Sequence, residues 1–258
     1  MFAVEENKSL IAFSTMRIGG TARYFAVCQD MEEIRTVVRF AKERGVPVVV
    51  VGTGSNMVWS DRVHDIFLLH NTIAGFDVID EDDTSTTVLV GAGENWDIAV
   101  ARCVELGLAG IEAMSAIPGT VGATPVQNVG AYGQEIKDTL VYVEVYDTQT
   151  DEFKKLSNDE CHFRYRDSIF KTEEKGRYII TRVAMKLSKL PPMQPRYPAV
   201  VSYFQEKGIS NPTLEEIRSA IVSIRASKLP DPTLVPNCGS FFENALVTTK
   251  KAEELKIQ

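Results

Sequence analysis

The 258-residue sequence lacks the signatures of several common protein classes. Its four cysteines (Cys28, Cys103, Cys161 and Cys238) form no C-x-x-C pair, and its three histidines show no metal-ligand spacing. We therefore expect reduced thiols and no metal site. The strongest apolar run, residues 46–51, is far too short to span a membrane. The first residues show neither the basic start nor the apolar core of a signal peptide, so we expect a cytoplasmic protein without membrane insertion.

Charge and nucleotide motifs exclude further classes. The net charge is −7 and no cluster of lysine and arginine stands out, so nucleic acid is not an expected partner. The G-x-G of Gly52–Gly54 lacks the third glycine of a Rossmann site, and no P-loop is present. Ser240 lies in no G-x-S-x-G motif and no histidine follows it, which makes a hydrolase triad improbable.

Hydrophobic periodicity predicts a mixture of helices and strands. Asp30 and Glu33 can cap a helix that carries apolar residues at helical spacing and ends near Gly45. Residues 48–51 predict a buried strand, and the Gly52–Asn56 loop after it presents N–H groups and a hydroxyl suited to phosphate. Further elements are predicted as helices at 95–106 and from Thr213, and as strands at 64–69, 76–80, 86–91, 141–146 and 179–187.

Residues 115–133 are the most informative segment of the chain. They hold four glycines and two prolines among small residues, with almost no charge. Glycine permits positive φ and a close approach of the backbone to a ligand, whereas proline fixes φ. Long loops without function are uncommon. The segment therefore predicts a cofactor or substrate loop rather than a plain connection.

Two further clusters leave alternatives open. In residues 163–171, Arg166 and Asp167 can form a surface ion pair, or Arg166 can be a fixed donor for a carboxylate or a carbonyl that gains charge. Spacing alone favours neither. In residues 237–244, Ser240 lies beside glycine and two phenylalanines. A serine that bonds to the backbone is the commoner case, and a desolvated proton donor is the sharper hypothesis.

Four motifs in fixed order resemble one family. They are Gly52–Asn56, Ile117–Gly133, Tyr165–Lys171 and Gly239–Asn244, and the similarity extends over essentially the whole chain. The sequence resembles the UDP-N-acetylenolpyruvoylglucosamine reductase (MurB) family of bacterial peptidoglycan synthesis. The resemblance implies an α+β fold. A two-part FAD-binding domain of the vanillyl-alcohol-oxidase (PCMH) type would occupy residues 1–72 and 73–229, and residues 230–258 would begin a mostly missing α+β substrate-binding domain.

The resemblance also implies a reaction and its residues. Bound FAD would carry a hydride from NADPH to UDP-N-acetylglucosamine enolpyruvate, which would give UDP-N-acetylmuramate, and the protein is expected to be a monomer. Arg166 and Ser240 match the family's catalytic arginine and serine. Residues that match its FAD contacts are Gly54, Ser55, Asn56, Gly119, Gln127, Asn128 and Gly130. Tyr197, Lys228 and Asn244 fall where the family contacts substrate.

The sequence departs from the family at its end. The family uses a third catalytic group, a glutamate near its C-terminus, and Glu243, Glu253 and Glu254 do not match that position. A fragment is the favoured interpretation. A shortened protein completed by a partner and a form with impaired chemistry are the alternatives, and a non-catalytic FAD-binding module is the alternative function. A general flavoprotein oxidase is disfavoured, because it has no use for the Ser240 proton donor.

Overall fold

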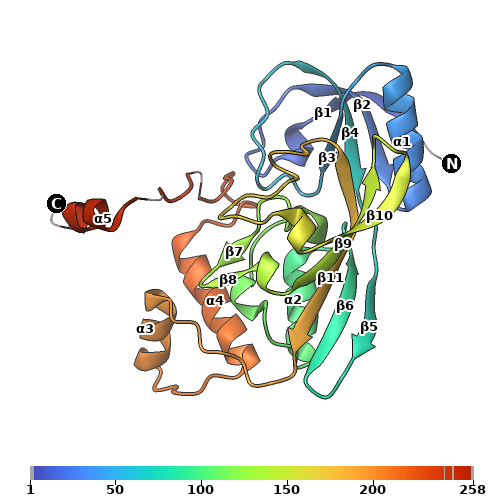
Figure 1. Ribbon diagram of the computed structural model, residues 1–258. Helices are drawn as coiled ribbons and strands as arrows, with labels where there is room; N and C mark the ends of the chain where they lie inside the picture. Colours follow the sequence, from blue (N-terminus) through green and yellow to red (C-terminus); the bar gives the residue numbers. More distant parts are fainter. Residues whose placement is uncertain (1–2, 241, 246, 257–258) are drawn as a thin grey trace.

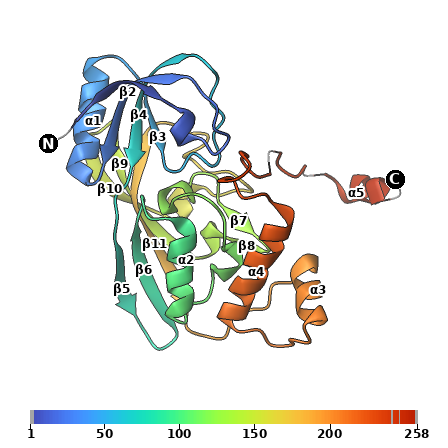
Figure 2. The ribbon, with the colours of Figure 1, turned by 180° about the vertical axis from the view of Figure 1, so that it is seen from behind.

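Two β-sheets, one above the other in Figure 1, form the body of the molecule. A computed structural model describes residues 3–240, 242–245 and 247–256 of the chain. Helix α1 lies against the upper sheet, and helices α2, α3 and α4 lie beside the lower sheet (Figure 2). The last segment leads away from this body to α5 (Thr249–Lys256).

The upper sheet contains a parallel β-α-β unit. Its strands, in spatial order, are β1 (Glu5–Ser9), β2 (Thr21–Cys28), β4 (Val63–Asn71) and β3 (Val48–Val51). Helix α1 (Met31–Glu43) connects β2 to β3, and its N-cap Asp30 accepts the Glu33 N–H at 2.9 Å, as the sequence predicts. The prediction that residues 48–51 form a buried strand is only half right. β3 is an edge strand of which only Val51 is buried, because it has a neighbour on one side alone.

The lower sheet is antiparallel and has five strands. In spatial order these are β10 (Glu152–Ser157), β9 (Leu140–Asp147), β11 (Tyr178–Ser188), β6 (Ser85–Gly91) and β5 (Phe76–Glu81). The hairpin of β5 and β6 is the one that the acidic turn predicts. The two sheets share a hydrophobic cluster, in which Tyr146 and Ile179 of the lower sheet lie with Ile34 of α1. The sheets are thus held together by packing.

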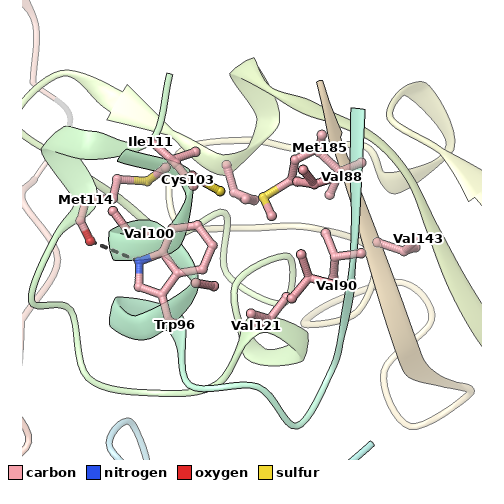
Figure 3. Packing of buried hydrophobic residues seen from close by; sticks show 14 of the residues in the cluster. Val88, Val90, Trp96, Val100, Cys103, Ile111, Met114, Val121, Val143 and Met185 are labelled. Atoms are coloured by element: carbon pink, nitrogen blue, oxygen red, sulfur yellow. Dashed lines mark hydrogen bonds between the residues drawn. The ribbon is translucent and has the colours of Figure 1, made fainter. Parts of the chain in front are cut away.

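The main core lies between the lower sheet and helix α2 (Trp96–Glu105) (Figure 3). Trp96 is fully buried there, and its indole N–H donates to the Met114 carbonyl at 2.9 Å. Val88 and Val90 of β6 point toward the helix. Because Met114 immediately precedes the glycine-rich segment, this core fixes where that segment begins.

Two more helices form a smaller layer beside α2. Helix α4 (Leu214–Lys228) begins with a capping box of Thr213 and Glu216, as predicted, and α3 (Pro198–Glu206) packs on it through a separate cluster that includes Phe204 and Ile221. In the part of the chain that the structure describes, no helix is long and apolar enough to cross a bilayer.

A buried carboxylate connects the edge of the lower sheet to the turn before β11. The Asp147 side chain is fully buried and accepts hydrogen bonds from Lys154 Nζ at 2.6 Å and from Arg177 Nη2 at 2.8 Å. The hydrogen bonds from Arg177 are the main cause that lowers the pKa of Asp147 well below its usual range, against the opposing effect of desolvation. The carboxylate therefore stays ionised while it is buried.

We predict that Asp147→Asn lowers the free energy of unfolding at pH 7 by about 3 kcal/mol, because it leaves two cations facing a neutral group. The folded-state pKa of Asp147 lies below the ordinary value of 3.8, so its contribution is present above that pH and is lost as the pH falls through the folded-state pKa. Urea denaturation at several pH values measures this effect. The difference in the free energy of unfolding between wild type and variant should become smaller below about pH 4. Asp77→Asn, at an exposed position of β5, is the control and should change little. A difference that stays constant down to pH 2 would contradict the prediction.

Candidate active site

The two glycine-rich loops predicted from the sequence lie against each other. The Ser55 hydroxyl donates to the Pro118 carbonyl at 3.0 Å, and Asn56 Nδ2 donates to Gln127 Oε1 at 2.7 Å. Gly52 is packed so tightly that a Cβ atom there would come within 2.4 Å of Thr120 Oγ1. Residues more than 60 positions apart in the chain thus form one continuous surface at the edge between the two sheets.

The surface has the features that an anionic dinucleotide needs. Within the described residues, the backbone N–H groups of residues 53–56 donate no hydrogen bond, so they can serve an anion. Gly54 has a φ of +68°, and a Cβ atom there would lie 2.0 Å from the Phe13 carbonyl oxygen. Nearby, the Thr15 hydroxyl is buried and has no partner in the same part of the chain. The residues present therefore fit a diphosphate held by main-chain donors.

The start of the second loop is held by charged side chains of two helices. Ala116 has a φ of +58°, which is unfavourable for a residue with a Cβ atom. Its N–H donates to Asp97 Oδ1 of α2 at 2.6 Å, and its carbonyl accepts from Arg225 Nε of α4 at 3.1 Å. Arg218 of α4 binds both oxygens of Asp97, at 2.6 and 2.9 Å. These contacts stabilise a backbone conformation that the loop does not favour by itself.

Arg166 of the 163–171 segment contacts the same loop and is firmly held. Its Nη2 donates to the Gly130 carbonyl at 2.6 Å, and its Nη1 donates to the Asn128 carbonyl at 3.2 Å and to Glu135 Oε1 at 3.1 Å. The surface ion pair with Asp167, one of the two alternatives that the sequence leaves open for Arg166, is formed by Arg164 instead, at 3.1 Å. The Asn128 side chain is fully buried and bonds within this region, so it shapes the loop.

The segment that carries Ser240 is attached at two places. The Asn237 N–H donates to the Thr15 carbonyl at 3.1 Å. Lys171 Nζ donates both to the Arg166 carbonyl, at 3.0 Å, and to Glu243 Oε1, at 2.8 Å. Ser240 and Asn244 are exposed, and Phe241 of the same motif lies outside the described residues. These contacts bring the Arg166 and Ser240 motifs, predicted separately, to one side of the molecule.

Tyr197 and Lys228 occupy the helical side of the site. Tyr197 precedes α3, is half exposed, and packs edge to face on Tyr132 with 5.2 Å between ring centroids. An open groove of about 980 Å³ adjoins Tyr132 and extends along residues 193–210. Lys228 is the last residue of α4 and is exposed. Of the predicted substrate residues, Tyr197 contacts the loop through Tyr132, whereas Lys228 and Asn244 lie at separate exposed positions.

Comparison with known proteins agrees with this geometry. Residues 22–157 match a family model described as an FAD-binding domain. The chain is 40% identical to a UDP-N-acetylenolpyruvoylglucosamine reductase of Pseudomonas syringae pv. tomato, over 99% of this chain and 75% of that relative. The chain belongs to the UDP-N-acetylenolpyruvoylglucosamine reductase family.

Solved structures support the fold of this reductase family. The enzyme named MurB from Thermus caldophilus superimposes with a TM-score of 0.71 at 22% identity, over 100% of this chain and 82% of that one. A 6-hydroxy-D-nicotine oxidase from Arthrobacter nicotinovorans matches with a TM-score of 0.54 at 18% identity, over 74% of this chain and 43% of the oxidase. The predicted α+β fold with a two-part FAD-binding domain is confirmed, and the chain is a flavin-dependent oxidoreductase.

Several residues that shape the site were not predicted from the sequence. Asp97 and Arg225 bond to the loop residue Ala116, and Arg218 bonds to Asp97. These are tertiary contacts, and no local sequence pattern around the three residues predicts them. Thr15 lies in the segment that resembles the family's start, but no pattern points to its hydroxyl. Glu135 gives one usable signal, because it follows Gly133 after a single residue and is a charged side chain at the end of an otherwise uncharged loop.

We predict that Gly54→Ala abolishes FAD binding, because the added methyl group would overlap the Phe13 carbonyl and displace the loop. Gly107→Ala is the matched control: Gly107 has a similar φ of +73° but no atom within 4 Å of a Cβ position. The control should lose about 1–2 kcal/mol of stability and keep its flavin. Flavin absorbance per mole of purified protein measures both results. A Gly54→Ala protein with wild-type flavin content would contradict the prediction.

Proposed function

We propose that this chain reduces the enolpyruvyl group of UDP-N-acetylglucosamine enolpyruvate with NADPH, which yields UDP-N-acetylmuramate for peptidoglycan synthesis. The family to which the chain belongs supports the reaction. The single observation that carries the proposal is the Arg166 guanidinium, held on the cofactor loop by three oxygens and joined through Lys171 to the segment of Ser240.

The chemistry needs a stabiliser of negative charge and a proton donor. Bound FAD supplies the hydride relay between NADPH and C3 of the enolpyruvyl double bond. Hydride addition at C3 builds negative charge on C2 and the neighbouring carboxylate, and a fixed cation lowers the barrier to that step. A guanidinium has five N–H donors, and three of those of Arg166 are used within the described chain. The Nε–H and one Nη2–H remain for the substrate carboxylate, which a guanidinium can bind through two parallel hydrogen bonds.

Ser240 is proposed to protonate C2. A hydroxyl is a weak acid, so it can act only at short range on a strongly basic carbon. Its exposed position between the Thr15 and Lys171 attachments leaves the hydroxyl accessible to a substrate that lies on Arg166. The proton that Ser240 gives is regained from solvent, so the net reaction consumes one NADPH and one proton for each product.

The remaining residues are proposed to bind the two nucleotides. Gly54, Ser55 and Asn56 would hold the FAD diphosphate, and Gly119, Gln127, Asn128 and Gly130 would border the flavin, Asn128 through its backbone. Lys228 would attract a substrate phosphate, while Tyr197, against Tyr132, and Asn244 would contact the UDP-sugar. The proposal requires that the groups outside residues 115–133 face that loop.

Anaerobic stopped-flow absorbance tests the reaction in two halves. We expect NADPH to bleach the bound flavin, and the enolpyruvyl UDP-sugar, added after NADP⁺ has been removed, to restore its absorbance. Product analysis should find UDP-N-acetylmuramate. Bleaching without any substrate-dependent recovery would reject the reductase and favour a non-catalytic FAD-binding module.

We predict that Ser240→Ala leaves the rate of flavin bleaching by NADPH within about twofold and slows recovery by the enolpyruvyl substrate by at least 10²-fold, the usual lower range for loss of a general acid. Hydride transfer from NADPH needs no proton at C2, whereas the second half does. Ser223→Ala, at an exposed position on α4, should leave both halves unchanged. Equal slowing of both halves in Ser240→Ala would rule out the role of proton donor.

A further inference from the structure

A two-stranded hairpin at the end of the glycine-rich loop carries a carboxylate into the site. Strand β7 (Gly130–Ala131) pairs with β8 (Gln134–Glu135), and the register places Glu135 directly opposite Gly130. Tyr132 and Gly133 between them have φ of +50° and +93°, as a tight two-residue turn requires. Because the register of so short a hairpin is set by its turn, the position of Glu135 follows from the loop itself.

Arg166 binds both strands of this hairpin. Its Nη2 bonds to the Gly130 carbonyl on β7, and its Nη1 bonds to the Glu135 carboxylate on β8. A Cβ atom at Gly130 would lie 2.7 Å from Cγ of Glu135 and 3.1 Å from Nη1 of Arg166. Only glycine at this position leaves room for the two charged side chains to meet. The side chains are about three-quarters or more buried, which strengthens their interaction relative to a surface pair.

The Glu135 carboxylate is itself held on both oxygens. Oε1 accepts from Arg166, and Oε2 accepts from Asn128 Nδ2 at 3.0 Å and from Lys137 Nζ at 2.8 Å. Desolvation acts to raise the pKa of Glu135, but the bonds from Lys137 and Asn128 and the charge of Arg166 outweigh it, so the pKa lies below its ordinary value. The carboxylate is thus a rigid, ionised anchor.

Among the contacts of Arg166, that to Glu135 differs in kind from the other two. The Asn128 and Gly130 carbonyls are neutral and belong to the loop backbone, whereas Glu135 is the one ionised acceptor that the guanidinium has among the described residues. A charge-assisted bond is roughly twice as strong as a neutral one and limits rotation of the guanidinium plane. The direction of the two remaining donors therefore depends chiefly on Glu135.

We propose that Glu135 is a positioning residue: its carboxylate fixes the plane of the Arg166 guanidinium so that Nε–H and Nη2–H point to where the substrate carboxylate gains charge. The proposal rests on the proposed function of Arg166 in the reductase. In this proposal Glu135 acts on the substrate through Arg166, which its carboxylate contacts directly.

Glu135→Gln tests the proposal, because it keeps the shape and the bond from Asn128 but removes the charge. We expect substrate-dependent recovery of the flavin absorbance to slow by about tenfold, in keeping with the sensitivity of rates to small misplacements. Bleaching by NADPH should stay within about twofold and substrate Kd within about threefold, because the cation itself remains. Lys137→Met is the matched control, since it removes another partner of the same carboxylate, and it should leave recovery within about twofold.

A second measurement does not depend on turnover. Nitrogen-15 NMR of the arginine side chains, with the Arg166 signals assigned through Arg166→Lys, should show separate Nη signals in the wild-type holoprotein and in Lys137→Met. In Glu135→Gln these signals should merge through faster rotation of the guanidinium. Unchanged Nη signals in Glu135→Gln would overturn the proposal, as would recovery within about twofold of the wild type. Parallel loss of both half-reactions and of bound FAD would instead assign Glu135 a structural role.

The two proposals fail in different ways. If the enolpyruvyl substrate does not restore the absorbance of the wild-type protein, the proposed function is rejected, and the NMR comparison still decides whether Glu135 orients Arg166. If the wild type turns over and Glu135→Gln matches it in both rate and spectrum, the proposed function stands and the positioning role is rejected.

Discussion

The site depends on a loop whose backbone is held from outside. In residues 115–133, Ala116, Asn128 and Tyr132 all have positive φ although each carries a Cβ atom, at a cost of order 1 kcal/mol apiece. Side chains from other elements offset this cost, with Asp97 and Arg225 on Ala116 and Arg166 on the Asn128 carbonyl. A loop stabilised in this way presents one surface to a ligand before the ligand arrives, which lowers the entropy that binding must overcome.

The architecture puts these partners where the loop needs them. Helix α2 follows β6 across the main core, so its first turn, with Asp97, faces the start of the loop. Helix α4 lies beside α2 and supplies both arginines from one face, seven residues apart. Arg225 is partly buried, and desolvation lowers its pKa from the ordinary value although it remains a cation. The smaller helical layer thus stabilises the loop through its two arginines in addition to forming a hydrophobic cluster of its own.

Much of the fold could be predicted because its signals are local. The N-terminal ends of α1 and α4 could be predicted from Asp30 and from the pair Thr213 and Glu216, because these capping hydrogen bonds span only three residues. The strands β1 and β10 were not predicted, because their exposed, charged sequences show no clear alternation and they pair only at sheet edges. The prediction that β3 is a buried strand was partly wrong for a related reason. An apolar run does not reveal how many neighbouring strands a strand has in its sheet.

The sequence by itself determined the glycine-rich loops, the order of four motifs and therefore the family, because these features lie in short stretches where residue type decides the backbone. It left Arg166 equally balanced between a surface ion pair and a fixed donor. Tertiary structure decided only its protein partners: Arg164 pairs with Asp167, and Arg166 is held by Glu135 and the Gly130 carbonyl, 31 and 36 residues away. Such pairs depend on how hairpin, loop and sheets pack together, and no periodicity along the chain records a distance across space.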